Sequence, residues 1–145
     1  MMRRFQFPLQ TVLRLRGQFE RQSRRVLAAA MAEVNGVEGR LRSVGQGLRE
    51  CADQANGVTT GAQLARALET GLRHYQWRLQ RELSRVQAVA ESARVAFLER
   101  RQELRSLERL RERRLDEWRT AAVAAEQGEL DELARMARAG QEAQP

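Results

Sequence analysis

Few residues of this chain have the types and spacing that catalysis requires. His74 is the only histidine, and the acids form the neighbouring pairs Asp116-Glu117 and Asp131-Glu132. A histidine can transfer a proton near neutral pH, and two carboxyl groups can share acid and base roles when they converge. Neighbouring residues on a helix diverge by about 100°, so neither acidic pair can converge. We interpret both pairs as solvated charges and assign His74 no chemical role.

The remaining reactive groups are equally isolated. Cys51 is the only cysteine, so it cannot form an internal disulfide or a metal-ligand cluster, and a reducing compartment is expected. The scattered glycines lack the spacing of a phosphate-binding loop after a strand. The segment 109–114 could contact phosphates through arginine, but acids are interspersed and aromatic residues are few. The sequence therefore predicts a non-enzymatic protein with no cofactor and no metal.

Composition favours long helices over a compact globule. Only 5% of the 145 residues are aromatic, 31% are charged, and the two prolines are Pro8 and Pro145. Nothing between these prolines interrupts a helix. The first ten residues are basic without a following apolar stretch, and no segment approaches the ~18 apolar residues of a membrane span. We expect the protein to remain in the cytoplasm.

The charge is positive and unevenly distributed. All 26 basic residues are arginine and the net charge is +7. Residues 1–57 carry +5 and residues 58–114 carry +6, whereas residues 115–145 carry −4. A basic body with an acidic end could steer acidic partners, but mixed charge is also typical of a solvated helix surface. Both interpretations stay open.

Two apolar seams predict an all-α antiparallel coiled-coil hairpin. Apolar residues recur every three or four positions, with a stutter between Val26 and Val37. The first seam runs through Leu9, Val12, Phe19, Val26, Val37, Leu41, Val44, Leu48 and Cys51, and the second through Leu64, Leu68, Leu72, Tyr75, Leu79, Leu83, Val86, Ala90, Ala93 and Phe97. Turn-forming residues cluster only between them. We expect a single domain, with helix one at about 9–56, a turn at about 57–61 and helix two at about 62–139.

The second helix should extend beyond the first. Folding about the turn leaves residues after about Leu110 without a partner, an overhang of about 110–139. Leu115 and Trp118, then Leu130 and Leu133, still follow helical periodicity there. An isolated amphipathic helix is marginal in water, so the overhang is either a frayed end or a binding surface.

The opening block of the chain is FQFPLQTVLRLR at residues 5–16, followed by Glu20 and the alanine-rich run at 27–30, and LDELA lies near the opposite end at 130–134. Together these two blocks resemble the flagellar export protein FliJ family. LERLRER at 107–113 is similar to the family's LEKLRER stretch. Glu126-Gln127 with LDELA at 130–134 is similar to its terminal pattern. The order and spacing hold over nearly the whole chain.

The resemblance implies a cytoplasmic component of the flagellar type III export apparatus, peripheral at the inner membrane and needed for flagellum assembly and motility. Family members are antiparallel coiled coils similar to the central stalk of rotary F-type ATPases. By this likeness the paired helix ends bind and activate the hexameric export ATPase, FliI. The hairpin middle and tip would reach the cytoplasmic domain of the export gate protein, FlhA. Escort of export chaperones is a further implied duty.

Two sets of candidate binding residues follow from this likeness. The gate-binding candidates are Leu41 on helix one and Leu68, Leu72, Tyr75 and Leu79 on helix two. The ATPase-ring candidates are Arg3, Arg4, Leu115, Trp118, Leu130, Asp131, Glu132 and Leu133. The same gate-side leucines also lie on the seam that must face the partner helix.

Two other functions stay open. One is the equivalent stalk of a virulence type III secretion system, which genome neighbourhood would distinguish. The other is a basic coiled-coil adaptor that binds nucleic acid or an acidic membrane face, which steep salt dependence of binding would reveal. The sequence leaves the oligomeric state open, because the exposed stripe of helix two could pair with a second copy.

Overall fold

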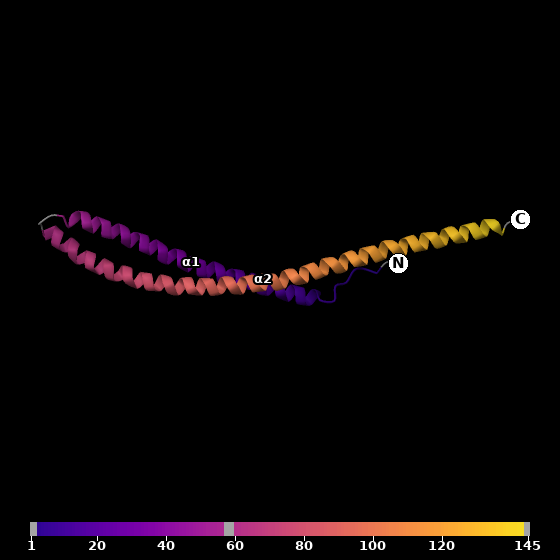
Figure 1. Cartoon of the computed structure of the whole chain (residues 1–145), viewed down its shortest axis with the longest axis horizontal. Helices are drawn as coiled ribbons and strands as arrows, with labels where there is room; N and C mark the ends of the chain where they lie inside the picture. The colour runs from indigo at the N-terminus through magenta and orange to yellow at the C-terminus, as the bar shows by residue number, and fades with distance from the viewer. Residues whose placement is uncertain (1–2, 57–59, 144–145) are drawn as a thin grey trace. The chain divides into compact units, whose positions relative to one another are not determined.

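The chain forms two long α-helices joined by one turn. The computed structural model describes residues 3–56 and 60–143, and it contains α1 (Gln10–Gln54) and α2 (Thr60–Glu142), with no strand in these ranges (Figure 1). Contacts between the helices run in opposite directions along the sequence. They include Gln10 with Arg111, Arg16 with Glu103, and Gly47 with Leu72. The all-α antiparallel hairpin with a longer second helix is therefore confirmed.

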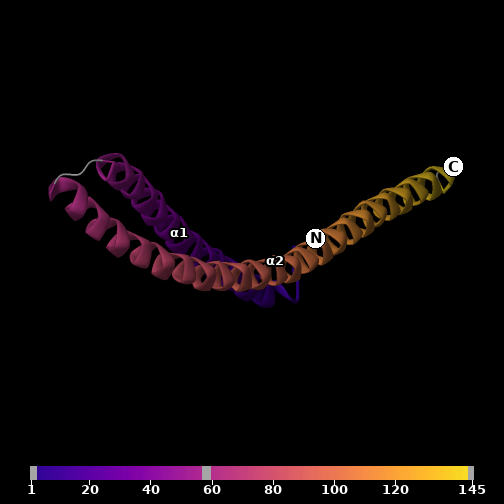
Figure 2. The same cartoon turned by 60° about the vertical axis from the view of Figure 1, so that its left-hand side comes forward.

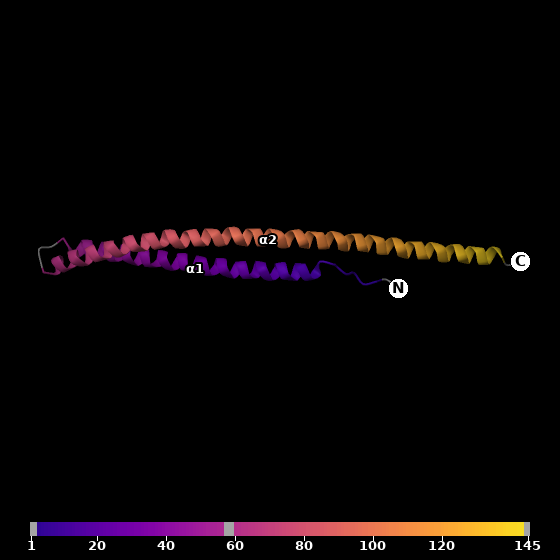
Figure 3. The ribbon, with the colours of Figure 1, turned by 90° about the horizontal axis from the view of Figure 1, so that it is seen from below.

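The chain divides into two contact units. The hairpin unit consists of Phe19–Arg101, and the terminal unit combines Met1–Gln18 with Gln102–Pro145. In the hairpin unit, α1 and α2 lie side by side in every view (Figure 2; Figure 3). The turn predicted at about 57–61 falls largely on residues 57–59, which lie outside the described residues. No helix in the described ranges is both long and apolar enough to cross a bilayer.

The α1 seam is a continuous heptad repeat and has no stutter. Its less exposed positions alternate by three and four residues: Leu13, Arg16, Glu20, Ser23, Leu27, Ala30, Val34, Val37, Leu41, Val44, Leu48 and Cys51. The predicted seam residues Leu9, Val12 and Val26 are instead 39%, 39% and 54% exposed. The prediction was wrong because polar residues occupy three consecutive seam positions and conceal the repeat from an apolar pattern.

The α2 seam is also shifted near the turn. Ala62 and Ala65 are buried there, whereas Leu64 and Leu68, both predicted in the seam, are 72% and 56% exposed. The heptad that runs back from Leu79 through Leu72 reaches these alanines and not the two leucines. The small alanines face α1, so the leucines turn towards solvent.

The apolar core lies in the middle of the hairpin unit. Val37, Val44, Leu79 and Val86 form its buried cluster, and Cys51 is also buried. Burying a valine or leucine side chain stabilises a fold by about 1.5–3 kcal/mol. Gly47 permits a close approach here, because a Cβ atom at this position would lie 3.3 Å from Leu72 Cδ1. The core therefore depends on a few aliphatic layers between two helices.

A non-helical N-terminal segment packs on α2 in the terminal unit. Phe7 is 8% exposed, and the ring centroids of Phe5 and Trp118 are 6.1 Å apart. Pro8 has no N–H and is suited to a helix start, and α1 begins two residues later. The sequence predicted no partner for α2 beyond about Leu110. The segment instead contacts α2 as far as Trp118, because an extended chain covers more length per residue than a helix.

Candidate functional site

Hollows on the hairpin unit are shallow and open. One groove between the helices is lined by Phe19, Gln22, Ser23, Val26, Ala93, Ala96 and Arg100. His74 lies outside it and stacks on Trp77 with ring centroids 6.3 Å apart, while the Arg81 guanidinium lies 4.9 Å from the Trp77 ring centroid. No group of His, Cys, Asp or Glu within the described ranges is arranged to hold a metal. The candidate sites are therefore exposed helix faces.

The five gate-binding candidates differ sharply in exposure. Leu79 is 4% exposed and belongs to the buried core cluster. Leu41, Leu72 and Tyr75 are partly buried and pack against that cluster. Leu68 alone among the five is mainly exposed, at 56%. A partner could contact Leu68 directly, whereas it could reach Leu79 only if the hairpin opened.

Sequence reasoning missed two exposed apolar residues near Leu68. Leu64 and Trp77 are 72% and 52% exposed, and the predicted seam register had placed Leu64 inside. Once the seam is drawn through Ala62 and Ala65, the leucines fall on a separate face. We call this face the tip stripe and define it as Leu64, Leu68, Gly71, Tyr75 and Arg78, which recur every four or three residues along α2.

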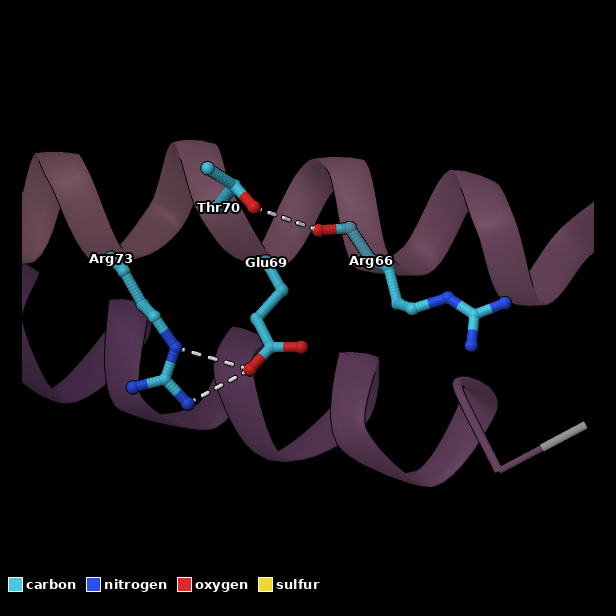
Figure 4. Close-up of polar contacts among 4 residues, drawn as sticks. All are labelled: Arg66, Glu69, Thr70 and Arg73. Atoms are coloured by element: carbon cyan, nitrogen blue, oxygen red, sulfur yellow. Dashed lines mark hydrogen bonds and ion pairs between the residues drawn. The ribbon is translucent and has the colours of Figure 1, made fainter.

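The surroundings of the tip stripe are basic. Residues 64–81 hold four arginines and one glutamate, a net charge of +3. Glu69 accepts hydrogen bonds of 3.1 and 2.8 Å from Arg73, while the Arg66 side chain extends away from that pair (Figure 4). The Arg78 guanidinium lies 5.7 Å from the Tyr75 ring centroid. Within the described ranges neither Arg66 nor Arg78 has a carboxylate partner, so positive charge is available to a partner.

Two arginines further along α2, Arg85 and Arg94, are paired with carboxylates of the same helix. Hydrogen bonds from Arg85 to Glu82 lower the pKa of that carboxyl, and those from Arg94 lower the pKa of Glu91 in the same way. In each pair the two residues are three positions apart on α2. Exposed pairs of this kind contribute little to stability.

The ATPase-ring candidates separate into two groups in the terminal unit. Leu115 and Trp118 are half-buried, and the Phe5 ring covers part of Trp118. Arg3 and Arg4 are exposed and precede α1 in the non-helical segment. The structure thus brings the N-terminal segment and Trp118 together, as an apolar cluster that also includes Phe7.

The other ring candidates lie on a helix end that has no covering element in the described chain. Leu130 and Leu133 are 65% and 62% exposed, and Asp131 and Glu132 are also exposed. Every residue from 123 to 143 is exposed. One face of this end carries Val123, Glu126, Leu130, Leu133 and Ala137, again at spacings of three and four, and we call it the acidic stripe. Residues 122–137 hold four acids and one arginine, a net charge of −3.

Comparison with known proteins identifies the family. A family model described as flagellar FliJ protein matches residues 5–143, which is nearly the whole chain. No curated protein and no solved structure matches. The matched range includes every candidate binding residue except Arg3 and Arg4. Proteins of this family are non-enzymatic components of the flagellar type III export apparatus. The chain therefore belongs to the FliJ family of flagellar export components.

Proposed function

We propose that this protein is a stalk-like coiled coil that binds and activates the hexameric export ATPase and couples it to the export gate. The observation that carries the proposal is the exposed amphipathic end of α2, residues 123–143, which no element of the described chain covers. An isolated helix of this kind gains stability by binding a partner. Arg3, Arg4, Leu115, Trp118, Leu130, Asp131, Glu132 and Leu133 remain the proposed ring-binding residues.

The test is the ATP hydrolysis rate of the export ATPase with full-length protein and with a version truncated after Ala122. This cut removes the exposed end and keeps Trp118, on which Phe5 packs. Activation by the full-length chain and loss of activation by the truncated chain are expected. A matched control is Leu98→Glu, an exposed leucine in the hairpin unit, which should activate normally. Equal activation by truncated and full-length protein would reject a ring contact through residues 123–143.

For the export gate, we propose that the exposed residues of the tip stripe make the contact. Among Leu41, Leu68, Leu72, Tyr75 and Leu79, accessibility favours Leu68 and the edge of Tyr75, joined by Leu64. The expected result is that Leu68→Glu weakens binding to the gate protein's cytoplasmic domain while helicity stays unchanged. Unchanged binding by Leu68→Glu and Leu64→Glu together would move the contact elsewhere.

Peripheral placement at the inner membrane and escort of export chaperones belong to the same proposal. Both would operate through partner proteins. The family match favours the flagellar apparatus over a virulence secretion system. Deleting the gene should abolish flagellar assembly, and expression of the full-length chain should restore it. Assembly of normal flagella without the gene would reject this assignment.

A further inference from the structure

The tip stripe and the acidic stripe match each other in spacing. Read in opposite directions, positions 64, 68, 71, 75 and 78 fall opposite positions 137, 133, 130, 126 and 123 without a gap. Two antiparallel helices with this match can pack continuously, because apolar positions on each recur every three or four residues. Both faces are available, since the leucines at 64, 68, 130 and 133 are 56–72% exposed.

The facing side chains complement each other in size. Leu68 would face Leu133, and Leu64 would face Ala137. Gly71 would face Leu130, and a Cβ atom at Gly71 meets nothing within 4 Å, so a leucine from another helix has room there. A large side chain packed against a glycine lets two helices approach closely. Three of the five layers are therefore apolar, and the other two contain Glu126 and Arg78.

The segments that carry the two stripes have opposite charges. Over the paired ranges, residues 64–78 carry +2 and residues 123–137 carry −3. In the antiparallel register, Glu126 lies opposite Tyr75 and one turn from Arg78, which stacks on that tyrosine. Glu129 falls beside His74 across the seam. Opposite charges along a helix pair select its partner and orientation.

We propose that two copies of this chain associate through these stripes, with the acidic stripe of each copy on the tip stripe of the other. Each copy carries both stripes, so two copies can satisfy one another reciprocally. The inference extends the proposed function, because the pairing covers the surfaces assigned to the ATPase and to the gate. The pair is then a resting form that either partner must displace.

The first test is a disulfide between two different copies. In a Cys51→Ser background, a tagged chain with Gly71→Cys is mixed with an untagged chain with Leu130→Cys under mild oxidation. Thiols that face one another cross-link faster than those that do not, by about tenfold or more. The matched control replaces Leu130→Cys with Gly128→Cys, which lies on the opposite side of the same helix turn. Equal cross-linking at 128 and 130, or none at 130, overturns the register.

The second test measures the solution mass of the protein alone by sedimentation. A species of twice the 16.6 kDa chain is expected, and Leu133→Glu should abolish it. Glu126→Arg should weaken the pairing about fivefold, and adding Arg78→Glu should restore it to within about twofold. A monomer at every concentration overturns the pairing.

Neither the ATPase nor the gate protein is present in these experiments. If the two copies do not pair, the proposed activation of the ATPase is therefore not affected and is tested separately. The combined prediction is that preformed cross-linked pairs fail to activate the ATPase until they are reduced. Full activation by the cross-linked pair would overturn the masking role while leaving both the pairing and the ring contact intact.

Discussion

The hairpin unit and the exposed end of α2 have similar amphipathic patterns but different surroundings. In the hairpin unit, Val37 and Val86 are almost fully buried because a second helix supplies the opposing layer. At the end of α2, Leu130 and Leu133 follow the same periodicity and stay more than 60% exposed. Helical periodicity therefore identifies a face that needs covering, and only the fold or a partner determines what covers it.

The largest contrast should appear when a leucine is truncated in each region. Leu79→Ala removes a buried core side chain and should lower the free energy of unfolding by about 3 kcal/mol. At concentrations where the chain is monomeric, Leu130→Ala should change it by less than about 0.5 kcal/mol, because no residue of the same chain covers this side chain. Urea unfolding followed by circular dichroism measures both. Similar losses for the two variants would mean that the exposed end is covered in solution, which sedimentation could then attribute to self-association.

A substitution in the N-terminal segment should have the next largest effect on stability, and this effect should be restricted to the terminal unit. Phe7→Ala should weaken packing on α2 by about 2 kcal/mol, since it removes a buried aromatic ring. Amide hydrogen exchange should accelerate around Leu110–Trp118 and stay unchanged around Leu79. Pro8→Ala serves as the control, because the Pro8 side chain is exposed. Unchanged exchange near Trp118 would show that the segment does not hold this part of α2.

A smaller effect, an increase in the stability of the hairpin, is expected when the polar seam residue Glu20 is replaced by an apolar one. Glu20 is 5% exposed and lies 2.5 Å from Arg24, whose side chain is 65% exposed. Glu20→Leu should stabilise the hairpin by roughly 1 kcal/mol, because it removes a desolvated carboxylate and leaves Arg24 in water. The exposed substitution Glu91→Leu provides the comparison. A destabilised Glu20→Leu variant would mean that the carboxylate makes further stabilising interactions in the seam besides its contact with Arg24.

The smallest effect concerns pH. The lowered pKa values of Glu82 and Glu91 mean that their pairs with arginine stabilise the folded chain above the ordinary carboxyl pKa of about 4.3. This contribution disappears as the pH falls through the lowered values. Thermal unfolding of the Glu82→Gln/Glu91→Gln variant should therefore depend slightly less on acidification than that of the parent chain. A steeper dependence in the variant would contradict the direction of these shifts.

Sequence reasoning predicted the hairpin and its unequal helices but missed details that depend on packing. Apolar periodicity was sufficient for the central layers around Val44 and Leu79, where the buried cluster of Val37, Val44, Leu79 and Val86 is aliphatic. It failed at Glu20, which is polar but lies in the seam, and at Leu64, which is apolar but lies outside. The N-terminal segment was missed because an extended chain has no helical period to detect.

The candidate sites were only partly accessible to the same reasoning. The family likeness supplied the gate and ring residues, but burial separates Leu79 from Leu68 and could not be read from a pattern that treats them alike. Their partner contacts, and the expectation of a single domain, stay predictions. The sequence alone could have added Trp77 to the candidate binding residues. The charged face of a helix is an unusual place for a large apolar ring such as that of tryptophan.

Cys51 is buried in the α1 seam near the turn, so the reactivity of its thiol reports how often the two helices separate there. A thiol that is 4% exposed reacts with a disulfide reagent only in molecules whose helices have separated. When closing outpaces labelling, the reaction rate relative to that of a free thiol equals the fraction of time the hairpin spends open. A single native sulfur atom therefore allows opening near the turn to be timed in the unmodified chain, with and without each partner.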